Sequence, residues 1–277
     1  MTTLRAPFVP GTDSLLSAAM HPVMREIART PREALIALDF DGTLAPIVDD
    51  PALSRAFPGA IEALAALAGG GVRVAIVTGR DALTVVDLGQ LQRVPGLLVS
   101  GLHGAQTWSD GQLISLQEPS GLAELRTALP ALLGQVDPGV WLEDKGLSLV
   151  VHTRRAEDPA GALAVLTEPV TALAVAHGLD VVGGKFVLEI RIPSLSKADA
   201  VGRLLEAPTA VAVFCGDDLG DLPAFEALKD WAADGSGRTA LAVSVGEAAE
   251  VRQAADLVLD SPAELTAILV ELAELVV

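Results

Sequence analysis

Apolar runs of strand length alternate with helical stretches over much of the chain. Residues 35–38 read Leu-Ile-Ala-Leu, and a near-continuous apolar run of this kind is typical of a fully buried strand in a parallel sheet. Further strands are predicted at 72–77, 97–100 and 210–215, with helices near 59–67 and 196–205. Strands and helices that alternate with short links predict a parallel, doubly wound (Rossmann-like) α/β core.

The alternation changes near residue 107. Asp110-Gly111 lies between short apolar pairs, which is a hairpin signal, and further hairpins are predicted to turn at Lys145-Gly146 and Gly183-Gly184. Hairpins imply antiparallel pairing, so this part is predicted to be a separate α+β insert. The predicted domains are an N-terminal lead at 1–33 with a helix from about Ser14 to Arg29, a core formed by 34–107 and 193–277, and an α+β cap at 108–192.

Composition indicates a globular chain. Its 277 residues are 51% hydrophobic and 20% charged, which suits one large domain or two moderate ones. No stretch approaches the roughly 18 uninterrupted apolar residues of a membrane span, so we expect no membrane association. Cys215 is the single cysteine, which excludes internal disulfides and a thiolate metal cluster. We expect a cytoplasmic protein.

Charge narrows the class of partner. The formal charge is −17, from 36 acidic and 19 basic residues. Nucleic-acid binding depends on Lys and Arg that neutralise phosphates, so this balance argues against a nucleic-acid partner. A small phosphorylated molecule remains compatible where a local cation offsets the global field. We therefore expect a small-molecule partner, and the composition allows a monomer.

Two aspartates follow the first predicted strand. Asp39 and Asp41 are two residues apart, so their side chains can point to the same side. They lie where the strand leaves the sheet, which is the edge at which open α/β folds bind ligands. Gly42 permits a sharp turn directly after them. The alternative is an ordinary Asx turn in which the carboxylates cap backbone amides.

Other predicted strand ends also carry polar groups. Thr78 and Arg80 follow the strand at 72–77, and the acidic segment 216–221 follows the strand at 210–215. Lys197 lies in the first turn of a predicted helix, where the helix dipole disfavours a cation, so an anion is expected beside it. Each group alone suits a turn or a solvated side chain. Their occurrence together at strand ends favours a site.

The residue types indicate phosphoryl-transfer chemistry. Hard carboxylate oxygens without His or Cys suit Mg²⁺, and the candidate ligands are Asp39, Asp41, Asp217, Asp218 and Asp221. Asp39 is the expected nucleophile and Asp41 the general acid/base. Thr78 and Lys197 are expected to hold the remaining phosphoryl oxygens.

These residues resemble the four motifs of the haloacid dehalogenase superfamily of phosphatases. The motifs are Asp39-Phe40-Asp41-Gly42-Thr43, Thr78, Lys197 and Gly216-Asp217-Asp218 with Asp221, in matching order and spacing over about residues 35–260. The resemblance implies a phosphatase or a phosphomutase, because an aspartate stands two residues after the nucleophile. The large insert between Thr78 and Lys197 is similar to the cap of the sugar-phosphatase branch.

The insert resembles the cap of trehalose-6-phosphate phosphatases. Glu143-Asp144-Lys145-Gly146, His152-Thr153-Arg154 and Leu188-Glu189-Ile190-Arg191 look like its segments, and residues 100–105 fit the same family. The resemblance implies Mg²⁺-dependent hydrolysis of trehalose 6-phosphate to trehalose and phosphate through an aspartyl-phosphate, a step of trehalose biosynthesis. The substrate-binding residues that it implies are Arg80, His103, Glu143, Lys145, His152, Arg154 and Glu189, with a structural role equally open for His103.

The predicted hairpins place these cap residues together. A turn on Lys145-Gly146 pairs Glu143 with Ser148, on the face shared by His152 and Arg154, while Glu189 and Arg191 share a face of the next hairpin. The alternative is a solvated polar face of a sheet.

Four positions depart from the family pattern. Gly220 and Leu222 stand where Thr and Glu are usual, Gln106 where Glu is usual, and Thr153 where Tyr is frequent. They flank the catalytic groups, so they leave the identity of the sugar open. A phosphatase for another glycosyl phosphate (sucrose or glucosylglycerol phosphate), a phosphomutase and a catalytically dead sugar-phosphate sensor are the remaining alternatives.

Overall fold

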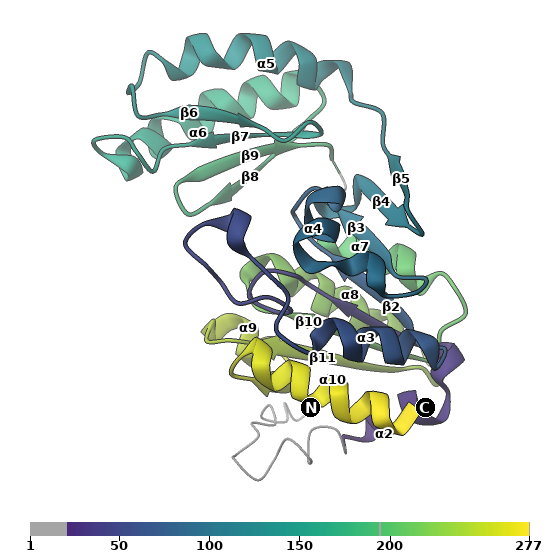
Figure 1. The fold of residues 1–277 in the computed structure, drawn as a ribbon. Helices are drawn as coiled ribbons and strands as arrows, with labels where there is room; N and C mark the ends of the chain where they lie inside the picture. Colours follow the sequence, from purple (N-terminus) through teal and green to yellow (C-terminus); the bar gives the residue numbers. More distant parts are fainter. Residues whose placement is uncertain (1–20, 194, 277) are drawn as a thin grey trace, which may run out of the picture. The chain divides into compact units, whose positions relative to one another are not determined.

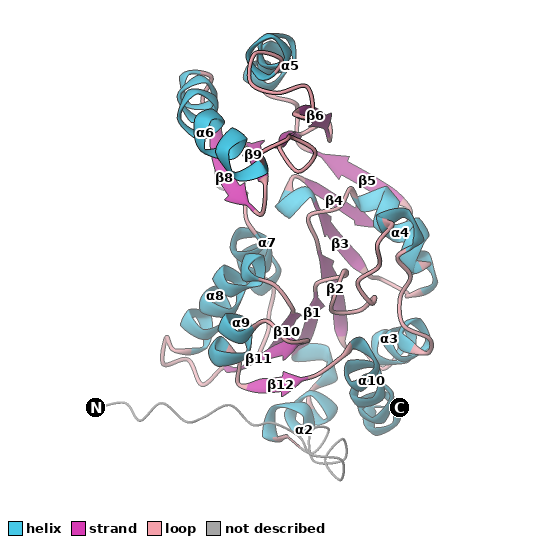
Figure 2. Ribbon diagram, turned by 90° about the vertical axis from the view of Figure 1, so that its left-hand side faces the viewer, coloured by secondary structure: helices cyan, strands magenta, loops and turns pink. Residues whose placement is uncertain are grey.

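The computed structural model describes residues 21–193 and 195–276. Two compact units are present, one formed by Met1–Ile114 with Ser196–Val277 and one by Ser115–Leu195. The first unit contains an eight-stranded sheet in the order β12-β11-β10-β1-β2-β3-β4-β5 (Figures 1 and 2). Its strands are β1 (Ala34–Leu38), β2 (Arg73–Val77), β3 (Leu98–Gly101), β4 (Gln106–Ser109), β5 (Gln112–Ser115), β10 (Val211–Gly216), β11 (Thr239–Val245) and β12 (Leu257–Leu259).

The central strand of this sheet is β1, which pairs in parallel with β10 on one side and β2 on the other. The chain moves outward through β2 and β3, then returns to the other side of β1 to form β10, β11 and β12. The strand order therefore reverses between β1 and β10. In open α/β sheets this reversal creates a crevice at the carboxyl ends of the strands.

Helices cover both faces of the sheet, as Figure 2 shows. One layer contains α2 (Pro22–Arg29), α3 (Ala60–Gly69), α4 (Ala82–Gly89) and α10 (Pro262–Val276), and the other contains α7 (Lys197–Leu205), α8 (Leu222–Ala232) and α9 (Ala249–Ala254). In β1, Ile36 and Leu38 belong to the first hydrophobic cluster, whereas Leu35 belongs to the second. A strand buried on both faces must be apolar throughout. The predicted doubly wound core is confirmed.

Short 3₁₀ helices link several of these elements. They are η1 (Pro31–Glu33), η2 (Pro51–Leu53), η3 (Leu91–Arg93), η4 (Leu102–Gly104) and η5 (Leu219–Asp221). The helix predicted from about Ser14 is described from Pro22 onward as α2, and residues 14–20 lie outside the described part of the chain.

The second unit is an α+β sandwich, as predicted for the insert. Its antiparallel sheet has the order β6-β7-β9-β8, with α5 (Ser120–Leu133) and α6 (Pro159–Ala176) on one face (Figure 1). The strands are β6 (Trp141–Asp144), β7 (Ser148–His152), β8 (Asp180–Gly184) and β9 (Val187–Arg191). Leu149, Val151, Leu188 and Ile190 point toward the helices and form the core of this unit. Alternate residues of the same strands form the opposite, more polar face.

The boundary of the insert differs from the predicted residue 108. Strand β4 pairs antiparallel with β3, with Val99 opposite Trp108, so the hairpin at Asp110-Gly111 extends the first sheet. The second unit begins at Ser115, and the chain returns to the first unit at Ser196 instead of 193. A hairpin signal predicts that two strands pair with each other. It does not indicate which sheet they join.

The other two hairpins also differ in detail. Glu143 lies opposite Val150 instead of Ser148. A slip of two residues leaves each side chain on the same face, so Glu143 still shares a face with His152. The second turn lies at Lys185-Phe186, not at Gly183-Gly184. Both glycines belong to β8 and pair with residues of β9, and Phe186 adopts φ 63° in the turn.

Among the described residues, α6 is long and apolar enough to cross a membrane by length and composition, with a mean hydropathy of 1.5. Ala162, Leu166, Val170 and Ala174 follow a four-residue spacing and are buried against the second-unit sheet. Their burial shows that this stripe of the helix packs within the second unit.

Candidate active site

Three polar side chains follow three adjacent strands of the first sheet. Asp39, Thr78 and Asp217 come directly after β1, β2 and β10. The Asp39 amide donates to the carbonyl of Cys215, and the Thr78 amide donates to the carbonyl of Ser100, each at 2.9 Å. These bonds continue the sheet ladder past the strand ends. They fix where the side chains leave the sheet, at the predicted edge.

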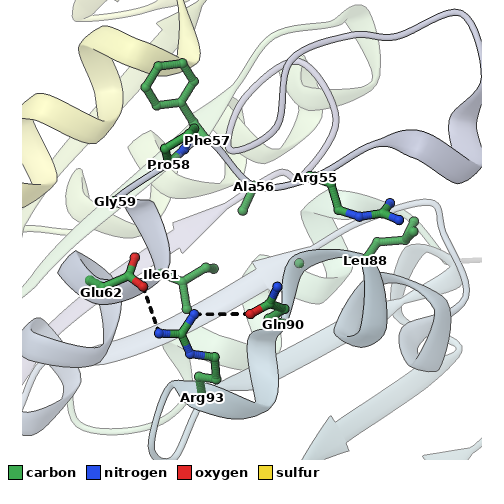
Figure 3. Close-up of a pocket in the computed structure, with 11 residues that line it drawn as sticks. Arg55, Ala56, Phe57, Pro58, Gly59, Ile61, Glu62, Leu88, Gln90 and Arg93 are labelled. Carbon is green, nitrogen blue, oxygen red and sulfur yellow. Dashed lines mark hydrogen bonds and ion pairs between the residues drawn. The ribbon is translucent and has the colours of Figure 1, made fainter.

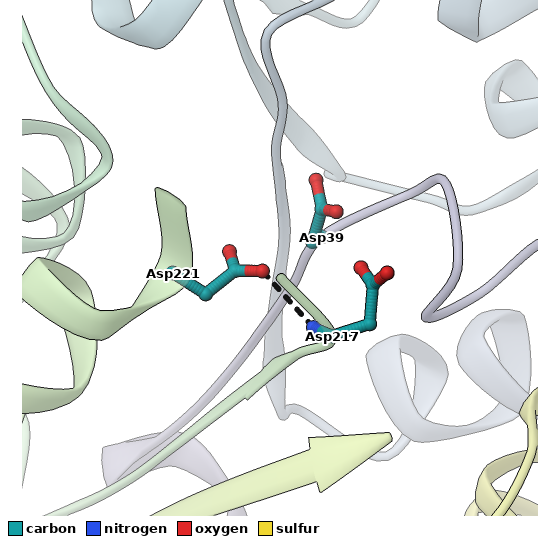
Figure 4. Close-up of side chains that lie close together, drawn as sticks. All are labelled: Asp39, Asp217 and Asp221. Carbon is teal, nitrogen blue, oxygen red and sulfur yellow. Dashed lines mark hydrogen bonds between the residues drawn. The ribbon is translucent and has the colours of Figure 1, made fainter. Parts of the chain in front are cut away.

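Three carboxylates meet at this edge. One oxygen each from Asp39, Asp217 and Asp221 lies within 4.8 Å of the others (Figure 4). Burial raises the pKa of Asp39 to about 7. The charge of Lys197 lowers this pKa and the charge of Asp217 raises it, but burial is the largest cause. Burial and the charges of neighbouring aspartates likewise raise the pKa of Asp217 to about 7. Burial and the neighbouring carboxylates thus both disfavour the ionised forms of these aspartates.

Lys197 is the cation within the cluster. Its Nζ lies 3.0 Å from Oδ1 of Asp39 and 2.7 Å from Oδ1 of Asp221, and the side chain is only 6% exposed. Burial alone lowers the pKa of an ammonium, but these carboxylates outweigh it and raise the pKa of Lys197. Ser196 caps α7 by accepting a hydrogen bond from the Asp199 amide. The position of Lys197 in the first turn of a helix predicted an anion beside it. Two protein carboxylates, those of Asp39 and Asp221, lie there.

Asp221 shapes the loop that carries Asp217. Its Oδ2 accepts hydrogen bonds from the amides of Asp217 (3.0 Å) and Asp218 (3.1 Å), while its Oδ1 holds Lys197. A Cβ on Gly216 would lie 2.4 Å from Cγ of Asp221. Only glycine allows this approach. Both carboxylate oxygens of Asp221 are thus engaged by protein donors.

Asp217 is oriented from the loop after β1. Oγ1 of Thr43 donates to Oδ1 of Asp217 at 3.2 Å. Gly42 adopts φ +81°, and a Cβ there would lie 2.0 Å from Oδ2 of Asp217. The sequence predicted no role for Thr43, although it belongs to the same motif as Asp39. Its contact joins residues 174 positions apart, so local spacing carries no signal for it.

The structure places Asp41 in a different set of contacts. Oδ1 of Asp41 accepts hydrogen bonds from Nη2 of Arg80 (2.7 Å) and Oγ of Ser54 (2.8 Å), and Oδ2 accepts one from Nε of Arg80. The hydrogen bond with Asp41 raises the pKa of Arg80. Arg80, predicted to bind substrate, is thus paired with the predicted acid/base. Ser54 is a contact that the sequence did not indicate.

Two further predicted residues, Asp218 and His103, lie near Lys197 and Thr78 respectively. Asp218 caps η5, accepting a hydrogen bond from the Gly220 amide at 2.9 Å, and its side chain is 65% exposed and 4.0 Å from Lys197. His103 donates its amide to the carbonyl of Thr78, and a Cβ on Gly79 would lie 2.9 Å from its Nε2. These contacts place His103 beside Thr78 and Gly79.

The predicted sugar-binding residues lie in the second unit. Nε2 of His152 lies 2.8 Å from Oε2 of Glu143, and the His152 ring stacks on Trp141 with centroids 4.4 Å apart. Glu189 accepts a hydrogen bond from Ser148 at 3.0 Å. The two glutamates flank Val150 on the polar face of the sheet. Lys145 lies in the β6–β7 turn and Arg154 follows β7, and both are exposed.

Known proteins match this chain over most of its length. The trehalose-phosphatase family model matches residues 37–262. A trehalose-phosphate phosphatase of Mycobacterium marinum is 32% identical over 91% of this chain, and one of Mycobacterium leprae is 35% identical over 72%. This chain belongs to the trehalose-phosphatase family. It spans 64% and 49% of the lengths of these two relatives.

A solved family structure has the same fold. The C-terminal domain of a C. albicans trehalose-6-phosphate phosphatase superimposes with a TM-score of 0.73 at 22% identity, covering 99% of each chain.

Two residues that depart from the pattern expected from the sequence make hydrogen bonds within the protein. Gln106 binds the Ala82 amide and Asp81, each at 2.8 Å, and Thr153 donates to the carbonyl of Pro159 at 2.9 Å.

A cavity of about 440 Å³ lies elsewhere in the first unit. The residues that line it are Arg55, Ala56, Phe57, Pro58, Gly59, Ile61, Glu62, Leu88, Gly89, Gln90 and Arg93 (Figure 3). None of the predicted site residues lines this cavity. Its most polar wall is internally paired, because Arg93 bonds both Glu62 and Gln90.

The donor set of the carboxylate cluster fits a divalent metal. Burial and mutual repulsion disfavour the ionised forms of Asp39 and Asp217, and a bound cation would offset both effects. Oxygen donors without nitrogen or sulfur suit a hard ion. Asp39 and Asp217 are the best placed, since both oxygens of Asp221 already hold protein groups.

The close approach at Gly42 gives a direct test. Gly42→Ala should lower the free energy of unfolding by at least about 2 kcal/mol, because a left-handed backbone and a steric overlap with Asp217 both penalise the methyl group. Gly235→Ala is the matched control, since Gly235 has the same φ of +81° and nothing within 4 Å. That variant should lose only about 1 kcal/mol. Equal losses in urea unfolding would show that the contact with Asp217 imposes no constraint.

Proposed function

We propose that this protein is a Mg²⁺-dependent phosphatase that hydrolyses trehalose 6-phosphate to trehalose and phosphate through an aspartyl-phosphate on Asp39. The observation that carries the proposal is the buried Asp39–Lys197 pair beside Asp217, at the sheet edge where ligands bind. Family membership supports the substrate, because the matched relatives are named trehalose-phosphate phosphatases.

The first step transfers the phosphoryl group to the protein. A carboxylate oxygen of Asp39 attacks phosphorus, and the bond from phosphorus to the sugar oxygen breaks. Asp41 gives its proton to the departing sugar oxygen, so trehalose leaves as a neutral alcohol. The Lys197 ammonium and the Thr78 hydroxyl hold the phosphoryl oxygens, whose charge would otherwise repel Asp39.

The second step regenerates the carboxylate. Asp41, now ionised, takes a proton from water as the water oxygen attacks phosphorus. The bond from phosphorus to the Asp39 oxygen breaks, and phosphate is released. Before the first step Asp41 must take up a proton from solvent and turn from Arg80 to the sugar oxygen, because both of its oxygens accept hydrogen bonds from protein donors in this structure.

Asp39 and Asp217 are the side chains that would hold the metal, with Thr43 and the loop amides bound by Asp221 fixing their positions. A divalent cation supplies positive charge that offsets the phosphoryl oxygens and the nucleophile. The three carboxylates that face the single ammonium of Lys197 support the proposal of such an ion.

We assign recognition of the sugar to the polar face of the second-unit sheet. Glu143, Glu189 and His152 offer acceptors and donors, and Lys145 offers an exposed cation at the end of the same hairpin. Such groups match the many hydroxyls of a disaccharide. A phosphatase for another glycosyl phosphate is the alternative. The hydrogen bonds of Gln106 and Thr153 within the protein explain these two departures without reference to the substrate.

Replacement of the nucleophile tests the mechanism. Asp39→Asn should reduce phosphate release from trehalose 6-phosphate by more than about a thousandfold, because the amide cannot form the phosphoenzyme. Circular dichroism should remain that of the parent protein. Asp87→Asn, at an exposed carboxylate of α4, is the control and should keep full activity. Near-normal turnover by Asp39→Asn would refute the assignment.

Replacement of cap residues tests substrate choice. Lys145→Ala and Glu189→Ala should each lower kcat/KM for trehalose 6-phosphate by about tenfold to a hundredfold, the cost of losing a charged hydrogen bond. The loss with p-nitrophenyl phosphate, which lacks the sugar, should be much smaller. Lys185→Ala removes an exposed cation from the neighbouring hairpin turn and serves as the control. Equal losses on both substrates would exclude a role in sugar recognition.

Metal binding should depend on pH. The pKa of Asp217 is about 7 in the folded protein, above its unfolded value near ~4. Between about pH 4 and pH 7 the folded protein therefore carries a proton on Asp217 that the unfolded protein lacks. Without metal, the stability that this proton contributes is lost as pH rises through 7. Protons compete with Mg²⁺ at pH 5.5 but not at pH 8. The same Mg²⁺ concentration should raise Tm by several degrees at pH 8 and by much less at pH 5.5.

Asp217→Asn is the control for the metal effect. This variant removes one candidate ligand, so Mg²⁺ should shift its Tm little at either pH. A Mg²⁺-induced shift of equal size at pH 5.5 and pH 8 would contradict the assignment of the metal to these carboxylates.

A further inference from the structure

The β6–β7 turn that carries Lys145 is shaped by one carboxylate. The Gly146 amide donates to Oδ1 of Asp144 at 2.8 Å, and Gly146 adopts φ +82°. The Lys145 amide donates to the carbonyl of Ser148 at 3.0 Å. These bonds form an Asx turn closed by the strand ladder. The direction in which the Lys145 side chain leaves the turn depends on the position of the Asp144 carboxylate.

A single guanidinium from α5 holds that carboxylate. Arg126 donates from Nε to Oδ2 of Asp144 (2.5 Å) and from Nη2 to Oδ1 (3.2 Å), a bidentate pair. Nη2 also lies 3.4 Å from the carbonyl oxygen of Gly146, and Nη1 donates to Glu118 at 2.7 Å. Arg126 therefore donates hydrogen bonds to residues on both sides of Lys145, the Asp144 carboxylate and the Gly146 carbonyl. It also fixes the segment that leads into α5.

The charges of this group leave Lys145 available. Two carboxylates, Asp144 and Glu118, pair with Arg126 and outweigh its charge, so the guanidinium does not repel the neighbouring ammonium. Hydrogen bonding to Arg126 lowers the pKa of Asp144, which keeps the turn-forming acceptor ionised. Within the described residues Lys145 has no hydrogen bond or ion pair through its side chain, and it is exposed.

We propose that Arg126 is a positioning residue for sugar recognition, which acts by fixing the Asp144–Leu147 turn and thereby the Lys145 ammonium. A planar fork with several donors is required, because one group must reach both oxygens of Asp144 and the carbonyl of Gly146. Exposed ion pairs contribute little to stability. The effect of Arg126 should therefore appear in substrate selectivity and not in the fold. The proposal rests on the proposed function, which assigns Lys145 to the sugar.

A double-mutant cycle tests the proposal. Arg126→Gln should lower the ratio of kcat/KM for trehalose 6-phosphate to that for p-nitrophenyl phosphate by about tenfold, mainly through KM, since a mobile Lys145 must be ordered on binding. In the Lys145→Ala background the same change should have no further effect on this ratio. Glu124→Gln, which breaks the ion pair of α5 with His177, should leave the ratio unchanged. Multiplicative effects of Arg126→Gln and Lys145→Ala, or an unchanged ratio, would overturn the proposal.

A second measurement does not depend on the substrate. Trypsin cleaves after lysine only where the chain can open locally, so the Lys145–Gly146 bond of a fixed turn should resist it. Arg126→Gln should speed this cut at least about fivefold, measured by mass spectrometry, while Glu124→Gln should not. An unchanged cleavage rate would overturn the proposal. If the parent protein hydrolyses no trehalose 6-phosphate, the proposed function fails, while the cleavage result still decides whether Arg126 fixes the turn.

Discussion

The site depends on the balance between one buried ammonium and three carboxylates, of which two are buried and that of Asp217 is half-buried. Lys197 bonds Asp39 and Asp221, and Asp217 lies within 4.8 Å of both carboxylates. A buried charge is costly unless it is paired, so the arrangement persists only because every member has partners. Asp221 uses its second oxygen to hold two loop amides. The same contacts that stabilise the cluster leave a surplus of negative charge. A divalent metal ion would offset the negative charge of the carboxylates. It would also offset the charge of a phosphate dianion bound beside them.

The fold supplies the other half of this arrangement. Strand β1 lies between β2 and β10, so polar residues that follow these three strands emerge side by side. The ladder continues past β1 and β2 through the amides of Asp39 and Thr78, which removes freedom from the side chains before any ligand binds. In the second unit the same logic applies to recognition. Burial fixes one face of the β6–β9 sheet against α5 and α6, and the opposite face is left for polar groups. The proposed function thus assigns phosphate chemistry to the first unit and sugar choice to the second.

Much of this arrangement could be predicted from residue patterns, and the limits have physical causes. Buried parallel strands are apolar throughout, so β1, β2 and β10 were recognisable, and Asp39, Thr78 and Asp217 followed from their ends. Pairing over long sequence separations left no local signal. The bonds of Thr43 to Asp217, Ser54 to Asp41 and Arg126 to Asp144 are examples. The ion pair of Asp41 with Arg80 was missed for the same reason, since each residue alone suggested a role toward substrate. The first hairpin was assigned to the wrong sheet, because alternation of side chains does not specify which edge a strand joins.

The central claim is that the buried cluster removes phosphate from trehalose 6-phosphate. Phosphate release by the parent protein from a panel of trehalose 6-phosphate, sucrose 6-phosphate and glucosylglycerol phosphate, with Mg²⁺ or with EDTA, tests it most directly. The account predicts that kcat/KM is highest for trehalose 6-phosphate and that EDTA abolishes release from every substrate. A higher kcat/KM for another sugar phosphate, or release that persists in EDTA, would contradict it.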